Sequence, residues 1–396
     1  MTTSDPAWQA WLAALDAVRR RMLGRPEAIA HPRVREQALY ALQAVTIGAH
    51  QMYLLPRQDY AQFQTRWHPF LLNWGGPASV MRYQWCFIDG RRSYRIRGRR
   101  GTTCFTDLQV FSGYFGDERM RSLGNYDLAR FHVDSDGRFE AVASPDPQPG
   151  NWIRLDPEQS RSIVQVRDVF DDWGARATEL DIDTLDRPAD SMHIDEAEFS
   201  VRLARTTRMV EQTVARALGY AKRVRQIAGG DNAFAEVKAE GGGESRDHGA
   251  SPRAGYYGLV WNIAPGEALV IEAPAPTARY WGLQLMDLWW GTLDYAWHQS
   301  GLNGRQMQVD ADGRFRAVLS FEDPGIANWL DPMHTPVGQC MLRWYDGTTP
   351  DLPQVRKVPF AERFSFLPAG TRTIDPAARA AAIAQRAAQA LARGPR

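Results

Sequence analysis

The stretch DSDGRFEAVASPDPQPGNWIRLDP, residues 134–157, returns later in the chain as DADGRFRAVLSFEDPGIANWLDP, residues 310–332. Both segments place Asp-Gly-Arg-Phe before an alternating apolar run, and both then reach Asn-Trp. The correspondence continues on either side, so that Arg167 matches Arg343, and the offset stays between 175 and 177 residues. A constant offset over so long a stretch indicates a duplicated domain rather than a short solenoid unit.

Each copy has the pattern of a β-domain. From Arg82 onward, short aromatic and β-branched runs with a period of two are separated by Gly, Asp and Arg turn signals. Each copy contains about seven or eight such runs, and Asp-Gly in each is a hairpin signal. We therefore expect a mainly β protein with helical additions (α+β), built from two tandem, duplicated β-sandwich or jelly-roll domains.

Helical patterns lie outside the two copies. The first helix is expected after Ser4 or Asp5, with Pro6 at its first position, and further helical patterns cover Pro32–Tyr53 and Arg57–Leu72. The Gly-rich, charged segment 229–255 is expected to be a mobile linker or lid. The expected organisation is an N-terminal helical region (1–78), a first sandwich (79–190), a helical connection (191–228), the linker, a second sandwich (256–370) and a C-terminal helix (371–396).

Composition and charge narrow the class of protein. The chain has 396 residues, a formal net charge of +1 and three cysteines without the spacing of a disulfide framework or a zinc site. A net charge this small gives the chain no general electrostatic attraction to nucleic acid or to an anionic membrane. No apolar run approaches the length of a transmembrane helix, and the N-terminus does not have the pattern of a secretory signal. We expect a cytoplasmic protein with neither nucleic acid nor membrane as a partner.

The segment ARYWGLQLMDLWWGTLDYAWHQSGLNGRQMQVDADGRFRAVLSFEDPGIANWLDP, residues 278–332, resembles the bacterial family called domain of unknown function 1214. The resemblance covers about 255–344, and a weaker likeness, loosely to the companion family 1254, extends back to about Arg82. The resemblance implies tandem β-sandwiches with helical additions. It implies no catalytic residues, because the activity of the family is not established.

Functional residues are expected where the two copies differ, since duplication frees one copy to acquire a site. The first copy has no counterpart of a dense group in the second: Trp289, Trp290, Asp294, Tyr295, Trp297, His298 and Asn303. On a helical turn, residues three and four apart share a face. We therefore predict His298 as an acid–base group, Asp294 as its orienter, Tyr295 as a hydrogen-bond donor, and the three Trp residues with Asn303 as a substrate pocket. The alternative is that these aromatics fill a sandwich edge and His298 makes a structural hydrogen bond.

These residues suggest an enzyme acting by proton transfer (a lyase, isomerase or hydrolase) on a bulky, largely apolar or aromatic small molecule. No metal or redox cofactor is expected, since His-x-His, G-x-G-x-x-G and P-loop motifs are absent, and no G-x-S-x-G elbow is present. One rival is a protein that binds carbohydrate or another small ligand through Trp stacking platforms. Another is an interaction protein, with a homodimer as one possibility. The arginines of 95–100 could hold an anion or form a solvated strand face.

Overall fold

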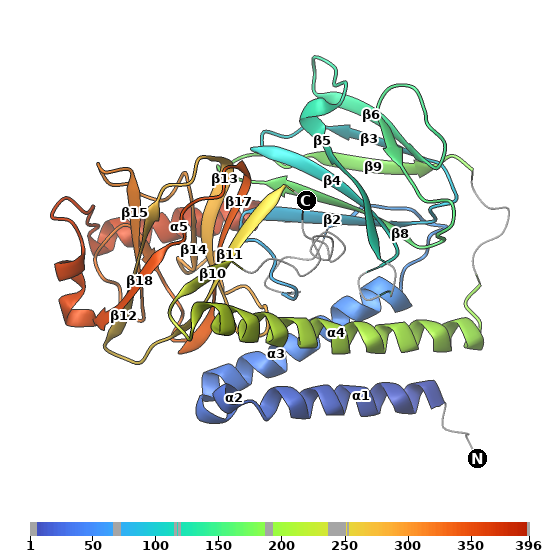
Figure 1. Cartoon of the computed structure of the whole chain (residues 1–396). Coiled ribbons are helices and arrows are strands. Elements are labelled where there is room, and N and C mark those ends of the chain that lie inside the picture. The colour runs from blue at the N-terminus through green and yellow to red at the C-terminus, as the bar shows by residue number, and fades with distance from the viewer. Residues whose placement is uncertain are drawn as a thin grey trace.

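The computed structural model describes residues 6–65, 73–114, 117, 120–186, 193–236, 251 and 253–393. Two β-sandwiches lie side by side, and a layer of helices crosses one face of both (Figure 1). The sequence-based expectation of a mainly β, α+β fold is confirmed. No described helix is both long and apolar enough to cross a bilayer.

The two sandwiches share one strand order. In the first, the larger sheet runs β1-β2-β8-β4-β5 and the smaller β7-β6-β3-β9; in the second, the larger runs β10-β11-β17-β13-β14 and the smaller β16-β15-β12-β18. When nine is added to each strand number of the first sandwich, the strand order of the second sandwich results. The first-copy strands are β1 (Gln64–Thr65), β2 (Met81–Ile88), β3 (Tyr94–Arg99), β4 (Phe105–Ser112), β5 (Arg121–Asp127), β6 (Arg138–Ser144), β7 (Trp152–Arg154), β8 (Ser162–Val169) and β9 (Glu179–Thr184). The second-copy strands are β10 (Phe234–Glu236), β11 (Ala254–Asn262), β12 (Glu267–Pro274), β13 (Ala278–Met286), β14 (Gly301–Asn303), β15 (Arg314–Ser320), β16 (Trp329–Leu330), β17 (Val337–Gly347) and β18 (Gln354–Pro359).

The duplication extends to individual hydrogen bonds. The indole N–H of Trp152 donates to the carbonyl of Ser144 at 3.2 Å, and that of Trp329 donates to the carbonyl of Ser320 at 3.0 Å. In both copies the preceding Asn donates to a carbonyl of the neighbouring strand at 2.8 Å. Trp152 and Trp329 thus occupy equivalent positions, and both are half-buried.

Alternation along the strands gives each large sheet two apolar faces. One face packs on the smaller sheet to form the sandwich core, represented by Ile96 and Val166 in the first copy and by Ile271 and Leu342 in the second. The next residues along each strand point the other way. Trp85 and Val260 on these outer faces pack against the helices, so both large sheets turn their second face toward the helical layer.

The described part of the N-terminal region contains four helical elements: α1 (Pro6–Leu23), α2 (Pro26–Ala30), α3 (Pro32–Ala49) and a continuing π-helical turn η1 (His50–Leu54). The helix predicted over Arg57–Leu72 is wrong where the structure describes it. Residues 57–63 are irregular, and Gln64 and Thr65 pair with Trp85 and Gln84 as an edge strand of the first sandwich. Residues 66–72 lie outside the described part.

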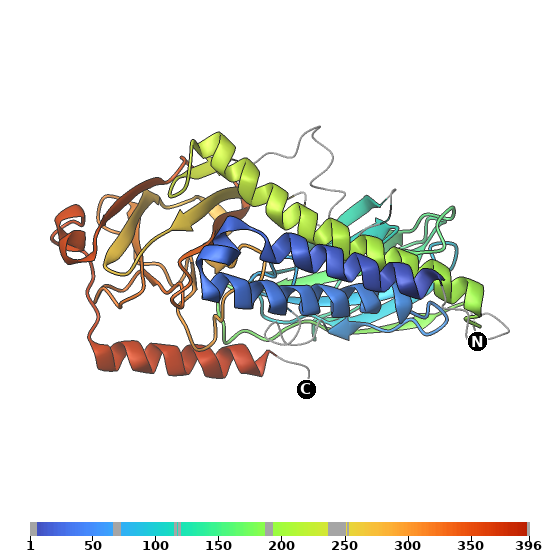
Figure 2. The same ribbon diagram turned by 90° about the horizontal axis from the view of Figure 1, so that it is seen from below.

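The long connection is α4 (Glu196–Ala228), whose N-cap Asp195 accepts from the backbone N–H of Glu198 at 2.8 Å. Figure 2 shows α1, α3 and α4 side by side across the sheets, with α5 (Pro376–Ala392) along the opposite edge. The predicted linker, 229–255, contains strand near both ends, because Phe234–Glu236 pair with residues 257–259 of β11, and β11 itself begins at Ala254. Its middle, 237–250, lies outside the described residues.

Helix α5 docks through arginines spaced seven apart. Arg379 lies 5.4 Å from the ring of Trp329, whereas Arg386 and Arg393 lie 4.2 and 4.1 Å from the ring of Trp173 in the first copy. Because helical residues seven apart share a face, one stripe of guanidinium groups touches both sandwiches.

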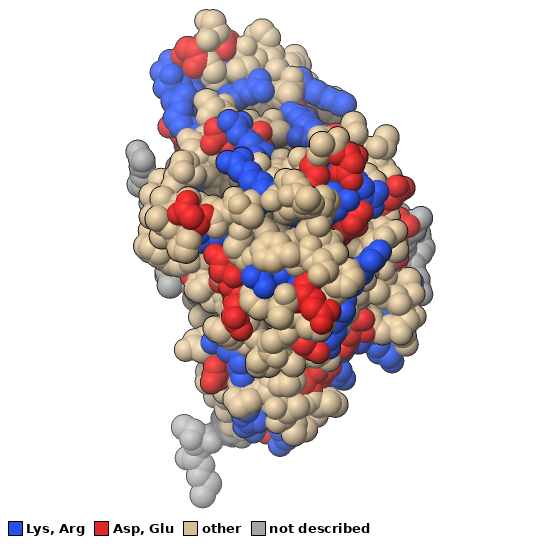
Figure 3. Space-filling view, turned by 90° about the vertical axis from the view of Figure 1, so that its left-hand side faces the viewer, with Lys and Arg blue, Asp and Glu red and all other residues tan. Residues whose placement is uncertain are grey.

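A second charged contact joins the copies. Asp127 of the first sandwich pairs with Arg279 at 2.6 Å and with Arg253 at 3.0 Å, and both guanidinium groups lie over the ring of Phe105. Away from this junction, acidic and basic side chains are intermixed over the outer end of the second sandwich (Figure 3). Charge is therefore balanced locally as well as over the whole chain.

Candidate functional site: a tyrosine–arginine cluster beneath helix α4

An arginine occupies the centre of the second sandwich's helix-facing surface. On β17, Leu342 and Trp344 belong to the sandwich core, so Arg343 between them points toward α4. Its neighbour on β11 is Tyr256, and its guanidinium carbon lies 5.3 Å from the centre of the Tyr256 ring. Arg343 and Tyr256 are half-buried, so water-accessible surface remains at this internal position.

The first sandwich has the same pair in a different electrostatic setting. Tyr83 and Arg167 are cross-strand neighbours, as Tyr256 and Arg343 are. Arg167 is neutralised by Asp107 at 3.4 Å on β4, and it donates at 2.8 Å to both Gln109 and Gln165. Its charge is thus matched within the protein.

In the second copy the residue corresponding to Asp107 is Gly282, the β13 neighbour of Arg343. A side chain there would collide with the Tyr280 hydroxyl, 2.8 Å from the Cβ position. No described carboxylate lies within 4 Å of Arg343, and its one hydrogen bond to a described residue is from Nη2 to the sulfur of Met341 at 3.4 Å. Its Nε is buried without a hydrogen-bond partner among the described residues.

Phenols surround this guanidinium group. Burial acts to lower the pKa of Arg343, whereas the phenols of Tyr256, Tyr83, Tyr345 and Tyr280 act to raise it, and the net shift is upward. The group therefore stays charged at physiological pH. A buried cation without an anion is costly, because the desolvation of an ion amounts to several kcal/mol.

Helix α4 and the 287–291 turn complete the surroundings. The Tyr220 hydroxyl lies 2.4 Å from the Cβ position of Gly258, so α4 approaches β11 this closely only because that residue is Gly. The Tyr220 ring packs edge-on against Trp290 at 5.6 Å. Both the Tyr220 hydroxyl and the Trp290 indole N–H are buried without a partner in the described part of the chain. We call Tyr83, Tyr220, Tyr256, Tyr280, Trp290, Arg343 and Tyr345 the Tyr–Arg cluster.

Trp290 is also unusual in its backbone. Its φ is +64°, a left-handed conformation that a bulky side chain rarely adopts. The turn is held by Asp287, whose carboxylate accepts from the N–H groups of Trp289 and Gly291 at 2.8 and 2.7 Å. Burial raises the pKa of Asp287 to about 7. Backbone strain is commonly retained where it positions a functional side chain, and here it points Trp290 at Tyr220.

The predicted acid–base group His298 has a different partner from the one expected. Its Nδ1 lies 2.7 Å from Oδ2 of Asp331, and this hydrogen bond raises the pKa of His298 above 6.5. Asp294 instead accepts from the backbone N–H groups of Ala296 and Trp297. The helical turn assumed in the sequence analysis is wrong, because residues 293–300 are irregular and Asp294 is used to bend the chain.

The other predicted residues are separated from one another. Tyr295 is buried and its ring contacts Trp173 at 5.8 Å. Trp289 is buried and donates to the carbonyl of Val34 on α3 at 3.2 Å. Trp297 is 58% exposed, and Asn303 is buried and donates to the carbonyl of Asp171. Of the seven predicted residues, Trp290 is the one that belongs to the Tyr–Arg cluster.

The remaining cluster residues could not be selected from local spacing, since they come from β2, α4, β11, β13 and β17. One signal was present in the repeat itself. Arg167 and Arg343 align, and so do Asp107 and Gly282 at the same offset of 175 to 176 residues. The arginine is retained in both copies, whereas the aspartate that neutralises it is replaced by Gly282 in the second copy, and this difference would have indicated the site.

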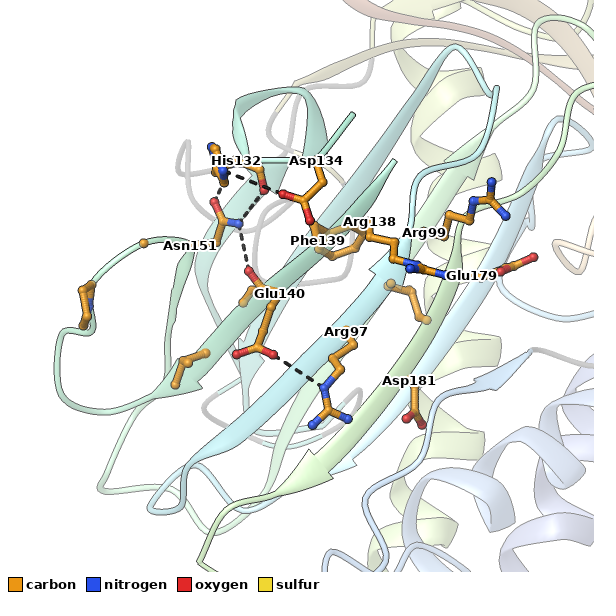
Figure 4. A pocket seen from close by; sticks show the side chains of 16 residues that line it. Arg97, Arg99, His132, Asp134, Arg138, Phe139, Glu140, Asn151, Glu179 and Asp181 are labelled. Atoms are coloured by element: carbon orange, nitrogen blue, oxygen red, sulfur yellow. Dashed lines mark hydrogen bonds and ion pairs between the residues drawn. The ribbon is translucent and has the colours of Figure 1, made fainter. Parts of the chain in front are cut away.

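The arginines of 95–100 lie on a different, open surface. A cavity of about 790 Å³ lies on the small sheet of the first sandwich. Figure 4 shows Arg97, in the lining of this cavity, directed toward Glu140. Arg97 pairs with Glu140 at 3.5 Å and with Asp183 at 2.8 Å, and Arg95 pairs with Glu140 at 3.2 Å. These pairs favour the interpretation of a solvated strand face with balanced charge. Among the described residues, no group of three or more His, Cys, Asp or Glu has the arrangement of a metal site.

The second sandwich carries the family likeness. Residues 267–349 match a family described as "Protein of unknown function (DUF1214)". The match includes Trp290, Gly282 and Arg343. It lies wholly in the second copy, so the likeness of the first half to the companion family stays a prediction.

Solved structures extend the likeness to the fold of the whole chain. The structure of an uncharacterized protein from Burkholderia cenocepacia is similar with a TM-score of 0.81 and 27% sequence identity, and the alignment covers 90% of this chain and 97% of that one. The VPA0106 protein from Vibrio parahaemolyticus gives a TM-score of 0.47 at 11% identity, covering 87% and 100% of the two chains. No curated protein matches the chain. The Burkholderia cenocepacia structure supports the fold, and none of these comparisons assigns an activity.

Proposed function

We propose that the protein binds a small monocarboxylic acid with an aromatic or apolar body at the Tyr–Arg cluster. The observation that carries this proposal is the half-buried guanidinium group of Arg343, which has no carboxylate within 4 Å among the described residues although its first-copy equivalent has Asp107. A ligand carboxylate would supply the missing counter-charge, and its two oxygens match the fork of a guanidinium group.

The other members of the cluster fit the rest of such a ligand. The rings of Trp290, Tyr220 and Tyr256 offer apolar faces, and the unpartnered hydroxyl and indole N–H groups offer hydrogen bonds to a polar substituent. Ligand sites commonly combine apolar walls with a few placed polar groups. This composition also agrees with the bulky, largely apolar molecule expected from the sequence.

The test compares benzoate, benzamide and a longer arylcarboxylate by isothermal titration calorimetry. We expect the carboxylates to bind and the neutral amide to bind at least tenfold more weakly, since a hydrogen bond to a charged group contributes about 1.5–3 kcal/mol. Arg343→Gln should abolish that preference, whereas Arg356→Gln, an exposed change on β18, should leave it unchanged. Equal affinity for benzoate and benzamide would contradict the proposal.

A second candidate is proton-transfer catalysis at His298, the enzyme activity expected from the sequence. The 2.7 Å contact with Asp331 favours it, because a carboxylate on Nδ1 fixes the imidazole and leaves Nε2 to act on a substrate. Here Asp331 takes the role first given to Asp294. His298→Ala should remove turnover of a co-purified ligand, identified by native mass spectrometry, without a large change in thermal stability.

The carbohydrate-binding alternative has less support. Every tryptophan in a described strand is buried or half-buried, so a sheet with exposed stacking rings is not seen among them. We propose a cytoplasmic location, which suits the three unpaired cysteines, two of them fully buried in strands. A homodimer stays a prediction that light scattering would test.

A further inference from the structure

A second cavity opens at the other end of α4, where its first turns meet η1 and the edge of the first sandwich. The cavity measures about 450 Å³ and lies within the size range of small-molecule sites. Its charged lining is predominantly basic, with three carboxylates, Asp59, Asp89 and Glu198, against five guanidinium groups, Arg91, Arg92, Arg161, Arg202 and Arg205. The net formal charge of the wall is therefore +2.

Four of these arginines are engaged by the protein. Arg91 forms a two-point contact with Asp89, with its shorter distance at 2.6 Å, and Arg92 donates to the carbonyl of Asp186 at 2.6 Å. Arg202 pairs with Glu198 at 2.7 Å. The carboxylates of Asp89 and Glu198 are therefore paired with arginines of the cavity lining other than Arg205.

Arg161 is held from behind the cavity. It pairs with Asp117 at 3.2 Å, and the same carboxylate also accepts from the Tyr53 hydroxyl at 3.1 Å and from the Tyr114 backbone N–H at 2.9 Å. Asp117 therefore fixes the orientation of Arg161. With three donors sharing its two oxygens, it has little capacity left for a further cation.

Arg205 has no ion pair or hydrogen bond among the described residues. Burial and the nearby charge of Arg161 both lower its pKa, whereas the carboxylates of Asp117 and Glu198 act in the opposite direction. The half-buried side chain thus lines the same cavity as Arg161, and the two guanidinium groups repel each other electrostatically. An arrangement of two converging guanidinium groups is stabilised by an anion with more than one charge.

We propose that this cavity binds a phosphate monoester, with the phosphoryl group between Arg205 and Arg161. A phosphate monoester carries about −1.5 to −2 charges at neutral pH, which matches the +2 of the wall better than a carboxylate does. The planar guanidinium fork pairs with phosphate oxygens as readily as with carboxylates. The cavity is larger than inorganic phosphate requires, so in this proposal the organic part of the phosphate monoester lies beside Tyr53 and Pro56.

The site is separate from the Tyr–Arg cluster. Arg205 and Tyr220 are 15 positions apart on α4, which at 1.5 Å per residue is about 22 Å along the helix axis. The two sites also differ in charge, since the cluster has one arginine without a counter-ion among the described residues, whereas the charged lining of this cavity has a net formal charge of +2. We therefore expect a carboxylate at one end of α4 and a phosphate at the other.

The experiment titrates the full chain with inorganic phosphate, phenyl phosphate and benzoate by calorimetry at low ionic strength. We expect phosphate to bind, phenyl phosphate to bind more tightly, and benzoate not to compete at this cavity. Arg205→Gln should weaken phosphate binding by about tenfold to a hundredfold, the value of one charge-assisted contact. Lys222→Gln removes an equal charge from an exposed position of the same helix and should change little.

Folding is checked by the melting temperature of the unliganded variant, which should not fall, because Arg205 makes no ion pair or hydrogen bond with the described part of the chain. Arg205→Lys should keep part of the affinity. Absence of phosphate binding to the parent protein overturns the proposal, and so does equal weakening by Arg205→Gln and Lys222→Gln. Loss of phosphate binding in Arg343→Gln would also overturn it, by assigning the phosphate to the Tyr–Arg cluster.

Discussion

The same substitution at the two equivalent arginines should change stability in opposite directions. Arg167→Met removes the main counter-charge of Asp107, whose side chain is fully buried, together with two hydrogen bonds of 2.8 Å. Breaking a buried pair from one side typically costs about 3–5 kcal/mol, because the remaining charge is stranded. Burial already raises the pKa of Asp107, and without Arg167 that rise should be larger.

Arg343→Met leaves no buried carboxylate of the described residues without its counter-charge. The lost contacts are the Tyr256 ring face and one sulfur acceptor, together worth about 1–2 kcal/mol. The desolvation cost of an uncompensated guanidinium group is several kcal/mol, and Met fills a similar volume. We therefore expect the free energy of unfolding to increase by about 1–3 kcal/mol.

Urea unfolding followed by tryptophan fluorescence measures both changes, provided that the slope m stays constant. The midpoint should shift down for Arg167→Met and up for Arg343→Met. A loss of stability in Arg343→Met as large as that in Arg167→Met would refute the reasoning, since it would mean that the protein itself satisfies Arg343. A stabilised variant that no longer binds benzoate would show that the site trades stability for function.

Three further outcomes are expected. The pKa of Asp287 is raised from 3.8 to about 7, so the folded state binds this proton more tightly than the unfolded state does. The free energy of unfolding should therefore decrease as the pH rises from about 4 to 7. In Asp287→Asn, which keeps the acceptor oxygen, that part of the pH dependence should disappear from thermal melts. The pKa of His298 followed by NMR should fall in Asp331→Asn, and an unchanged value would show that the 2.7 Å contact does not persist in solution. Gly258→Ala should destabilise by about 1–3 kcal/mol because the new methyl group meets the Tyr220 hydroxyl at 2.4 Å, and Tyr220→Phe in the same chain should recover part of that loss in a double-mutant cycle.

The duplication was predictable from sequence because register in a sandwich fixes the spacing of turns and core residues. Residues such as Asn151 and Asn328 make the same hydrogen bonds in both copies, so the offset between the copies varies by only two residues. The helix predicted over Arg57–Leu72 was wrong for a tertiary reason. Gln64 finds a hydrogen-bonding partner strand around Trp85, and that pairing overrides the local helical pattern.

The site was predictable only in part, because its members meet through cross-strand register. His298 and Asp331 are 33 positions apart, and local spacing favoured Asp294. Trp290 was found because it stands out within its own segment. Arg343 stands out only when Gly282 and Asp107 are compared, and that comparison requires knowing which strands are neighbours.

The arginine stripe of α5 has a consequence for the order in which the chain is assembled. During synthesis the first sandwich leaves the ribosome long before residues 376–393, yet among the described residues the guanidinium groups over the ring of Trp173 in that sandwich are those of Arg386 and Arg393. Arg386 also donates to the carbonyls of Tyr295 and Gly301 in the second sandwich. This seam between the copies therefore closes only after both sandwiches have been synthesised. A nascent chain stalled before Pro376 would present two formed sandwiches with an open seam, a state that proteases and chaperones can recognise.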